Sequence, residues 1–259
     1  MSSRLVFSPK AHTYSLDGQR VPSVSAIKGV LDKAALPWAA ARETAAWAAA
    51  HAHELAQLGE ATWREAAIRA HREVWDAKRD DGTRVHTIAE ALVFGEPVPE
   101  VDADGVPWSD DVRLMGEQVA RFMDRWDVEP VLVEVPVFHE EQRYAGKPDL
   151  LADLRDGARW LIDYKTGTTG PYQEVALQLS GYRNCTHVAL AEHDEPMPEV
   201  ERLGVLWVRP DGWELLPIDV TDTSWRVFLA CKFILENYAS LSREQVVLAA
   251  LPVPEVGAA

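Results

Sequence analysis

The sequence predicts an α/β protein in which a mixed central sheet is flanked by helices. Two observations support this fold class. Short segments rich in β-branched and aromatic residues, which are typical of strands, occupy residues 131–137, 144–154, 159–165, 202–209 and 213–220. Longer segments with helical periodicity or high alanine content occupy residues 37–58, 62–78, 110–126 and 224–238. With 259 residues, 47% of them hydrophobic, the chain can form one large domain or a core with an added flank.

The first 81 residues are predicted to form a hairpin and a helical extension that packs on the core. Residues 6–21 have the pattern of two strands joined by a turn at Asp17-Gly18. Ser23 is placed to cap a short helix, and the alanine-rich helices follow it. We expect the core to span residues 82–245 and residues 246–259 to form a frayed tail.

A histidine lies in the segment that opens the predicted core. Asp81-Gly82-Thr83 has the composition of a helix start, which places His86 near the beginning of a helix with Ile88 on its apolar face. A single histidine on a helix is more often packed or solvated than a ligand. Glu90 lies one turn after His86, where it either accepts a hydrogen bond from the imidazole or is an ordinary solvated glutamate.

A lone acid interrupts the apolar strand at residues 131–137. Strand alternation places its four valines on one face and Glu134 on the other. Glu134 is therefore either an additional ligand at the edge of a site or an exposed residue on a half-buried sheet.

Two acids and a lysine are expected to converge on adjacent strands. Alternation along residues 159–165 places Asp163 and Lys165 side by side on one face. A predicted hairpin turn at residues 155–157 brings the preceding strand alongside, so that Asp149 comes within reach of Asp163. Two neighbouring carboxylates repel each other unless a cation lies between them, and their hard oxygen atoms favour Mg²⁺ or Mn²⁺.

This combination suits the hydrolysis of a phosphodiester. One or two divalent ions position a water molecule and neutralise charge on the phosphate and the leaving oxygen. Lys165 would orient the water, stabilise the developing charge or act as a base, and the sequence does not separate these roles. An isolated D-x-K pattern is more often an exposed ion pair, so the interpretation depends on the surrounding motifs.

Gln178 and Tyr182 lie one turn apart on a predicted helix after the Asp163 strand. We expect this helix to start near Pro171, with Thr169 or Gly170 as its cap and a free amino end that favours phosphate. Gln178 and Tyr182 are then either substrate-binding residues or part of the packed face of the helix.

Taken together, these motifs resemble those of the PD-(D/E)XK nuclease superfamily, and most closely its RecB-like branch of phage exonucleases and CRISPR adaptation nucleases. The matching segments are Gly82 to Glu90 around His86, Gly146-x-x-Asp149, Asp163-Tyr-Lys165-Thr-Gly and Gln178-x-x-x-Tyr182. They span well under half of the chain. The resemblance implies a restriction-endonuclease-like core, and it implies that metal binds to His86, Asp149, Asp163 and the Tyr164 backbone carbonyl, with Lys165 catalytic.

The resemblance also implies an activity. We expect a Mg²⁺- or Mn²⁺-dependent DNA exonuclease of phage or bacterial recombination or repair, acting on linear ends, with a recombination or single-strand-binding protein as an additional partner. The alternative is an inactive nucleic-acid-binding scaffold with the same fold. Iron–sulphur members of the branch need four cysteines, whereas this chain has two, so no cluster is expected.

The remaining composition limits the partners. A formal net charge of -15 argues against a protein that coats DNA through charge alone. The best local basic track consists of Arg64, Arg69, Arg72, Lys78, Arg79 and Arg84, but interleaved acids favour a solvated, salt-bridged helix. We expect Trp38, Trp47, Trp63 and Trp75 in the core and Trp108 in an exposed loop. The cysteine usage and the absence of an apolar leader or membrane span predict a cytoplasmic protein.

Overall fold

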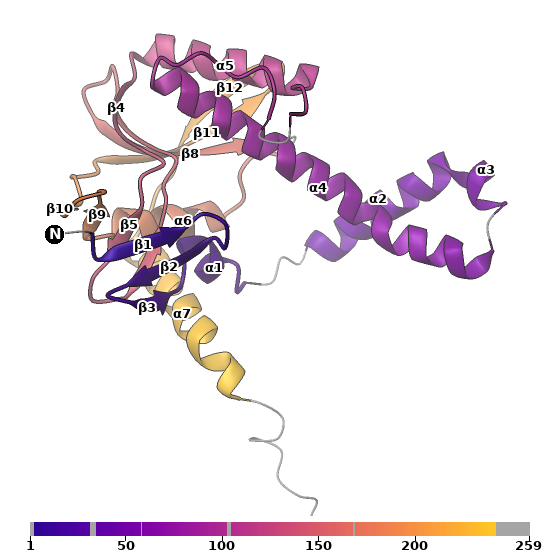
Figure 1. The fold of residues 1–259 in the computed structure, drawn as a ribbon, viewed down its shortest axis with the longest axis horizontal. Helices are drawn as coiled ribbons and strands as arrows, with labels where there is room; N and C mark the ends of the chain where they lie inside the picture. The colour runs from indigo at the N-terminus through magenta and orange to yellow at the C-terminus, as the bar shows by residue number, and fades with distance from the viewer. Residues whose placement is uncertain (1–2, 32–34, 58, 103–104, 168, 242–259) are drawn as a thin grey trace, which may run out of the picture.

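The computed structural model describes residues 3–31, 35–57, 59–102, 105–167 and 169–241 (Figure 1). The predicted tail at residues 246–259 lies outside the described residues. The mixed α/β architecture predicted from the sequence is confirmed, with a five-stranded sheet between helices. Among the helices of the described residues, none is both long and apolar enough to cross a bilayer.

The five-stranded sheet has the strand order β12-β11-β8-β7-β4. Its strands are β4 (Glu129–Val133), β7 (Leu150–Asp153), β8 (Arg159–Thr166), β11 (Arg202–Arg209) and β12 (Gly212–Pro217). β11 and β8 are parallel, whereas the other neighbouring pairs are antiparallel. The predicted hairpin is confirmed, because β7 and β8 pair with Leu150 opposite Ile162 and the connection turns at Gly157, which has a φ of 78°. This pairing brings the start of β7 next to the later part of β8.

Helices cover both faces of this sheet. α4 (Glu60–Val93) and α5 (Asp110–Trp126) pack on one face, and α1 (Val24–Lys28), α6 (Glu174–Arg183) and α7 (Asp222–Asn237) pack on the other. The predicted alternation along β8 is confirmed. Trp160, Ile162 and Tyr164 belong to the core under α4 and α5, whereas Leu161 belongs to the core under α6. Side chains of one strand therefore serve two separate cores.

Two smaller sheets lie beside the α6 side of the molecule. One has the order β10-β9-β5-β6, and the other is formed by β1, β2 and β3. Their strands are β1 (Leu5–Ser8), β2 (Thr13–Leu16), β3 (Gln19–Val21), β5 (Val137–His139), β6 (Tyr144–Gly146), β9 (His187–Ala189) and β10 (Asp194–Pro196). The turn predicted at Asp17-Gly18 joins β2 to β3, and the third strand β1 was not expected. Ser23 caps α1 as predicted, accepting a hydrogen bond from the Ala26 N–H at 3.0 Å.

The predicted strand at residues 144–154 is wrong as a single element. The chain leaves one sheet at the end of β6 and enters another at the start of β7, so residues 147–149 connect two sheets. Pro148 occupies this connection, and proline cannot donate a hydrogen bond to a sheet. Asp149 therefore belongs to the connection and precedes the strand.

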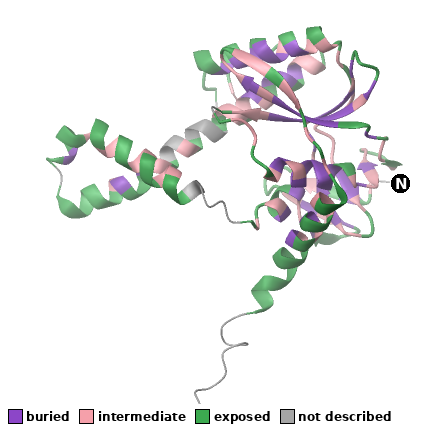
Figure 2. Ribbon diagram, turned by 180° about the vertical axis from the view of Figure 1, so that it is seen from behind, coloured by how far each residue is buried: buried purple, intermediate pink, exposed green. Residues whose placement is uncertain are grey.

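A helical arm extends from the body. It consists of α2 (Ala35–Ala50), α3 (Ala52–Leu55) and the amino-terminal part of α4, and Figure 2 shows it as largely exposed. α7 ends in a short 3₁₀ turn (Tyr238–Ser240). Arg64 and Arg69 on the arm form ion pairs with Glu60 and Glu65, in agreement with the predicted salt-bridged helix. The side chains of the predicted basic residues 78 and 79 lie outside the described residues.

The helix start predicted at Asp81-Gly82-Thr83 is wrong. α4 runs through this segment without interruption, and the expected domain boundary between residues 81 and 82 lies inside it. A Cβ atom at Gly82 would lie 3.3 Å from the hydroxyl oxygen of Thr166, the last residue of β8. The glycine thus marks a close approach between helix and strand, and His86 lies nearer the carboxyl end of α4 (Glu60–Val93) than its amino end.

The tryptophans differ from the prediction. Trp38 is 81% exposed on the arm, and Trp63 is also exposed, because few residues pack on this part of α2 and α4. Trp108 is buried, and its indole N–H donates to the Pro99 carbonyl. Trp108, which was expected in an exposed loop, is therefore part of the core, whereas Trp38 and Trp63, which were expected in the core, are exposed.

Candidate metal centre

The functional residues gather at one end of the five-stranded sheet. The end of β4, the start of β7 and the end of β8 meet there, because these three strands are antiparallel neighbours. α4 crosses above this end and α6 lies below it. Side chains from both layers can therefore reach the same point.

Asp149 is fixed at this point by the backbone of β8. Its Oδ2 accepts a hydrogen bond from the Tyr164 N–H at 2.6 Å. The connection approaches α6 closely, since a Cβ atom at Gly146 would lie 2.6 Å from the Tyr182 ring. The glycine of the G-x-x-D motif is thus required by the packing of Tyr182, whose hydroxyl donates to the Lys147 carbonyl at 3.2 Å.

Glu134 lies just after β4, in a left-handed backbone conformation with a φ of 52°. The predicted continuous strand at residues 131–137 is therefore wrong, and its valines are divided between the two cores. A non-glycine residue in this conformation is strained, and such strain clusters at functional sites. Here the Glu134 N–H donates to the Asp149 carbonyl at 3.2 Å, which holds the two acids together.

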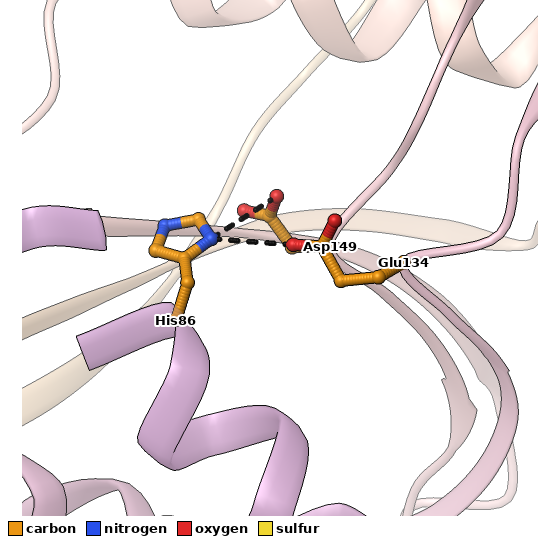
Figure 3. A group of neighbouring side chains, drawn as sticks. All are labelled: His86, Glu134 and Asp149. Carbon is orange, nitrogen blue, oxygen red and sulfur yellow. Dashed lines mark hydrogen bonds and ion pairs between the residues drawn. The ribbon is translucent and has the colours of Figure 1, made fainter. Parts of the chain in front are cut away.

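His86 reaches the two acids from α4 (Figure 3). Its Nδ1 atom lies 3.4 Å from Glu134 Oε1 and 3.5 Å from Asp149 Oδ1. One ligand atom from each of these residues lies within 4.8 Å of the other two, as in a metal centre. The Tyr164 ring packs edge-on against the imidazole at 5.5 Å between centroids.

Glu90 does not support this histidine. Its side chain is exposed, and no hydrogen bond or ion pair joins it to His86, although both residues are among those described. The expected interaction is replaced by contacts of the imidazole with Glu134 and Asp149. Glu90 is therefore the solvated glutamate of the alternative interpretation.

The pKa values of these three residues are shifted because several charged groups lie close together in a partly buried site. Burial lowers the pKa of His86, but the charges of Asp149 and Glu134 outweigh burial and raise it to about 9. Burial raises the pKa of Asp149 to about 6, against the opposing attraction of His86. For Glu134, burial acts upward, but hydrogen bonds from His86 and Lys147 bring its pKa below the ordinary value. A proton on His86 thus partly neutralises the two acids.

The Asp163 side chain points to the α6 face of β8, and it is only 3% exposed. Its Oδ1 accepts a hydrogen bond from the Gln178 amide at 2.7 Å, and its Oδ2 forms an ion pair with Lys165 but no hydrogen bond. The Lys165 ammonium also donates to the Tyr164 carbonyl at 3.3 Å. Tyr164 therefore links both groups, since its N–H binds Asp149 and its carbonyl binds Lys165.

The structure thus places the predicted residues in two adjoining groups. His86, Glu134 and Asp149 form one group, and Asp163 and Lys165 form the other, with the Tyr164 peptide between them. Gln178 and Tyr182 are buried and face the sheet, so the packed alternative fits their position better than direct contact with a substrate.

Two further residues were not assigned a role from the sequence. Lys147 forms an ion pair with Glu134, with 2.7 Å between Nζ and Oε2. Lys28 of α1 donates to the Gln178 side-chain carbonyl. The position of Lys147 beside Asp149 in the G-x-x-D motif was a usable signal, whereas Lys28 is 150 positions from its partner.

The amino end of α6 also differs from the prediction. The helix begins at Glu174, and Gln173 precedes it without a capping hydrogen bond. Thr169 binds the Tyr172 hydroxyl at 3.0 Å, so neither it nor Gly170 caps the helix. The phosphate site was expected at a helix start near Pro171, and the structure has no helix start there.

Comparison with known proteins yields little. No family model matches the chain, and no curated protein matches it. Sixteen chains of solved structures match, among them one titled "Crystal structure of SSO0001". This neighbour is 13% identical, with a TM-score of 0.29, and the match covers 62% of this chain and 74% of that chain. At this level of similarity the match supports no argument about fold family or function.

Proposed function

We propose that this protein is a metal-dependent deoxyribonuclease with a restriction-endonuclease-like core of the RecB-like PD-(D/E)XK type. One observation carries the proposal. His86, Glu134 and Asp149 meet within 4.8 Å at the sheet end where Asp163 and Lys165 also lie. A structural protein has no need to collect three acids, a histidine and a lysine at one partly buried place, since removing charges from water is costly.

The donor atoms fit a divalent ion. Two carboxylates suit Mg²⁺ and Mn²⁺, and the imidazole nitrogen favours a first-row transition metal, so Mn²⁺ suits the set better than Mg²⁺. Asp163 Oδ2 is buried and already pairs with the Lys165 ammonium, so this oxygen lies where positive charge is favoured. His86, Glu134 and Asp149 would hold the ion, with Asp163 and the Tyr164 carbonyl as further oxygen ligands. A bound ion supplies charge neutralisation at the phosphate and lowers the pKa of a water molecule.

The protein side chains supply position and charge. Lys165 carries a positive charge beside Asp163, where it can stabilise the anionic transition state of a displacement at phosphorus. Gln178 orients Asp163 through a single amide hydrogen bond, and Lys28 orients Gln178 in turn. This arrangement keeps the acid and the lysine in register on one face of β8.

The proposed substrate is DNA, with linear ends preferred over internal sites, in phage or bacterial recombination or repair. Exonuclease action and a recombination or single-strand-binding partner follow from the motif resemblance alone, whereas a cytoplasmic location is proposed from the cysteine usage. The second candidate is a scaffold that binds nucleic acid without cleaving it. The intact Asp149, Asp163 and Lys165 favour the enzyme, because binding alone does not require this set.

Cleavage of two labelled DNA forms tests the proposal. Purified protein is incubated with end-labelled linear duplex and with closed circular DNA, in Mn²⁺ or in EDTA. We expect loss of the linear form in Mn²⁺ only, with the circle preserved. Binding without cleavage would favour the scaffold, whereas cleavage of the circle would replace exonuclease with endonuclease. Asp149→Asn serves as the matched inactive control.

A further inference from the structure

Lys147 contributes a second ammonium group to the site. Its Nζ lies 2.7 Å from Glu134 Oε2, so Glu134 is shared between this lysine and His86. Glu134 is one of the three residues whose ligand atoms converge. In the absence of a metal ion, Lys147 therefore supplies part of the positive charge that the site requires.

The backbone of Lys147 is fixed while its side chain has room to move. Its carbonyl accepts a hydrogen bond from the Tyr182 hydroxyl, and the following Pro148 restricts its backbone to extended conformations. The side chain is 34% exposed, and its Nζ lies 5.8 Å from the centre of the Phe7 ring. A lysine side chain is long and flexible, so its ammonium can leave Glu134 without any movement of the chain.

The contacts of Lys165 differ from those of Lys147. Its ammonium contacts both Asp163, which is buried and oriented by Gln178, and the carbonyl of Tyr164. Among the described residues, Lys147 has one acidic partner, Glu134, and Glu134 is one of the proposed metal ligands. An ammonium and a divalent ion repel each other strongly at such short range, so both cannot be bound fully to Glu134.

We propose that Lys147 is an exchangeable counter-ion of Glu134. Its ammonium pairs with Glu134 in the metal-free protein and turns to a substrate phosphate when Glu134 binds a divalent ion. Lys147 is thus a substrate-binding residue that becomes available only in the metal-loaded protein. This inference rests on the proposed nuclease function for the phosphate, but the competition with metal is independent of it.

The competition is tested by calorimetric titration of Mn²⁺ into the metal-free full-length protein. We expect Lys147→Met to bind Mn²⁺ about tenfold more tightly than wild type, because a like charge near the ion has been removed. Lys147→Arg keeps the charge and should remain close to wild type. The control is Lys232→Met, which breaks a Lys–Glu pair of the same 2.7 Å length on α7, outside the site. Unchanged or weaker Mn²⁺ binding by Lys147→Met would overturn the proposal.

The phosphate role is tested with a duplex oligonucleotide in Mn²⁺, with Lys165→Ala present in both the Lys147 protein and the Lys147→Met protein so that the probe stays intact. Lys147→Met should bind this probe more weakly than the Lys147 protein, with a salt slope smaller by about 1, as for loss of one phosphate contact. The mutation thus has opposite effects on the two ligands, which a merely misfolded variant would not produce. Equal probe affinity of these two proteins would overturn the phosphate role. If the Lys147 protein fails to bind the probe, the nuclease function is wrong, and the Mn²⁺ titration still decides whether Lys147 competes for Glu134.

Discussion

Asp149 and Asp163 are neighbours at one sheet end, yet they are held in different ways. The Asp149 side is joined by an imidazole at 3.5 Å and by a backbone N–H. The Asp163 side is joined by Gln178 and Lys165, and Lys28 supports Gln178 from α1. The first group contains three potential ligands, whereas the second consists of one acid with a fixed set of partners.

From this difference we infer that the Asp149 side serves to bind metal and the Asp163 side serves to position Lys165. The ionic contacts of His86 with Glu134 and Asp149, at 3.4 and 3.5 Å, are long and are easily exchanged for bonds to a cation, since little geometry is lost. The contacts of Asp163 are buried and oriented, so this side preserves the position of Lys165. We therefore expect mutations on the Asp149 side to change metal binding first and mutations on the Asp163 side to change turnover first.

The largest effect is expected from the two acids themselves. Asp149→Asn and Asp163→Asn should each reduce Mn²⁺-dependent DNA cleavage by more than about 10²–10³, the usual loss on removal of one electrostatic group. Asp149→Asn should also weaken Mn²⁺ binding more than Asp163→Asn does, as measured by calorimetry. Its melting temperature without metal should stay the same or rise, because burial disfavours the Asp149 charge. Either variant with wild-type cleavage would remove that acid from the site.

Lys165→Ala should rank next. We expect a loss of about 10²–10⁴ in cleavage rate, typical of a positioned charge or proton-transfer group. Mn²⁺ affinity should not fall, since Lys165 supplies no ligand atom and, among the described residues, its ammonium contacts Asp163 and the Tyr164 carbonyl. Single-turnover kinetics at saturating Mn²⁺ separate the two quantities. An unchanged rate would show that Lys165 belongs to the fold and takes no part in the reaction.

Gln178→Leu sharpens the contrast between orientation and ligation. It should reduce cleavage by about 10–100-fold, the usual effect of removing a group that orients a ligand. The control is Gln118→Leu, which removes another buried amide, one that donates to the Pro210 carbonyl away from the site. Both changes should lower stability in thermal unfolding, but only Gln178→Leu should slow cleavage. Equal cleavage by the two variants would contradict a positioning role.

The last prediction is a pH dependence of Mn²⁺ binding. The pKa of His86 is raised to about 9, so its ring carries a proton at neutral pH that must leave before the nitrogen binds metal. Mn²⁺ affinity should therefore increase as pH rises towards 9, by up to about tenfold per unit for one displaced proton. His86→Gln should bind Mn²⁺ more weakly and lose most of this slope. A wild-type affinity that is flat between pH 6 and 8.5 would mean that His86 is not a ligand.

The periodic parts of this fold were predictable from the sequence. Alternation in β8 assigned Trp160 and Leu161 to opposite faces, and the turn before it fixed the hairpin with β7. These features depend on local patterns that a short segment carries by itself. The placement of Asp163 beside Lys165 followed for the same reason.

Long-range contacts decided what the sequence could not predict. Gly82 has the appearance of a helix breaker, but it lies inside α4, where a Cβ atom would come within 3.3 Å of the Thr166 hydroxyl of β8. Glu134 leaves its strand in a left-handed conformation that the valine pattern does not indicate. The exposure of Trp38 depends on whether anything packs against α2, which composition does not determine.

The three residues of the His86 group belong to segments that are far apart in the chain. One lies on α4, one follows β4, and one connects β6 in the four-stranded sheet to β7 in the five-stranded sheet. A divalent ion bound here would link α4 to the end of β4 and to the connection between the two sheets. Such an ion would add about 2.7 kcal/mol to the free energy of unfolding at a concentration 100 times its dissociation constant. The stability of the fold would then depend partly on the concentration of the ion.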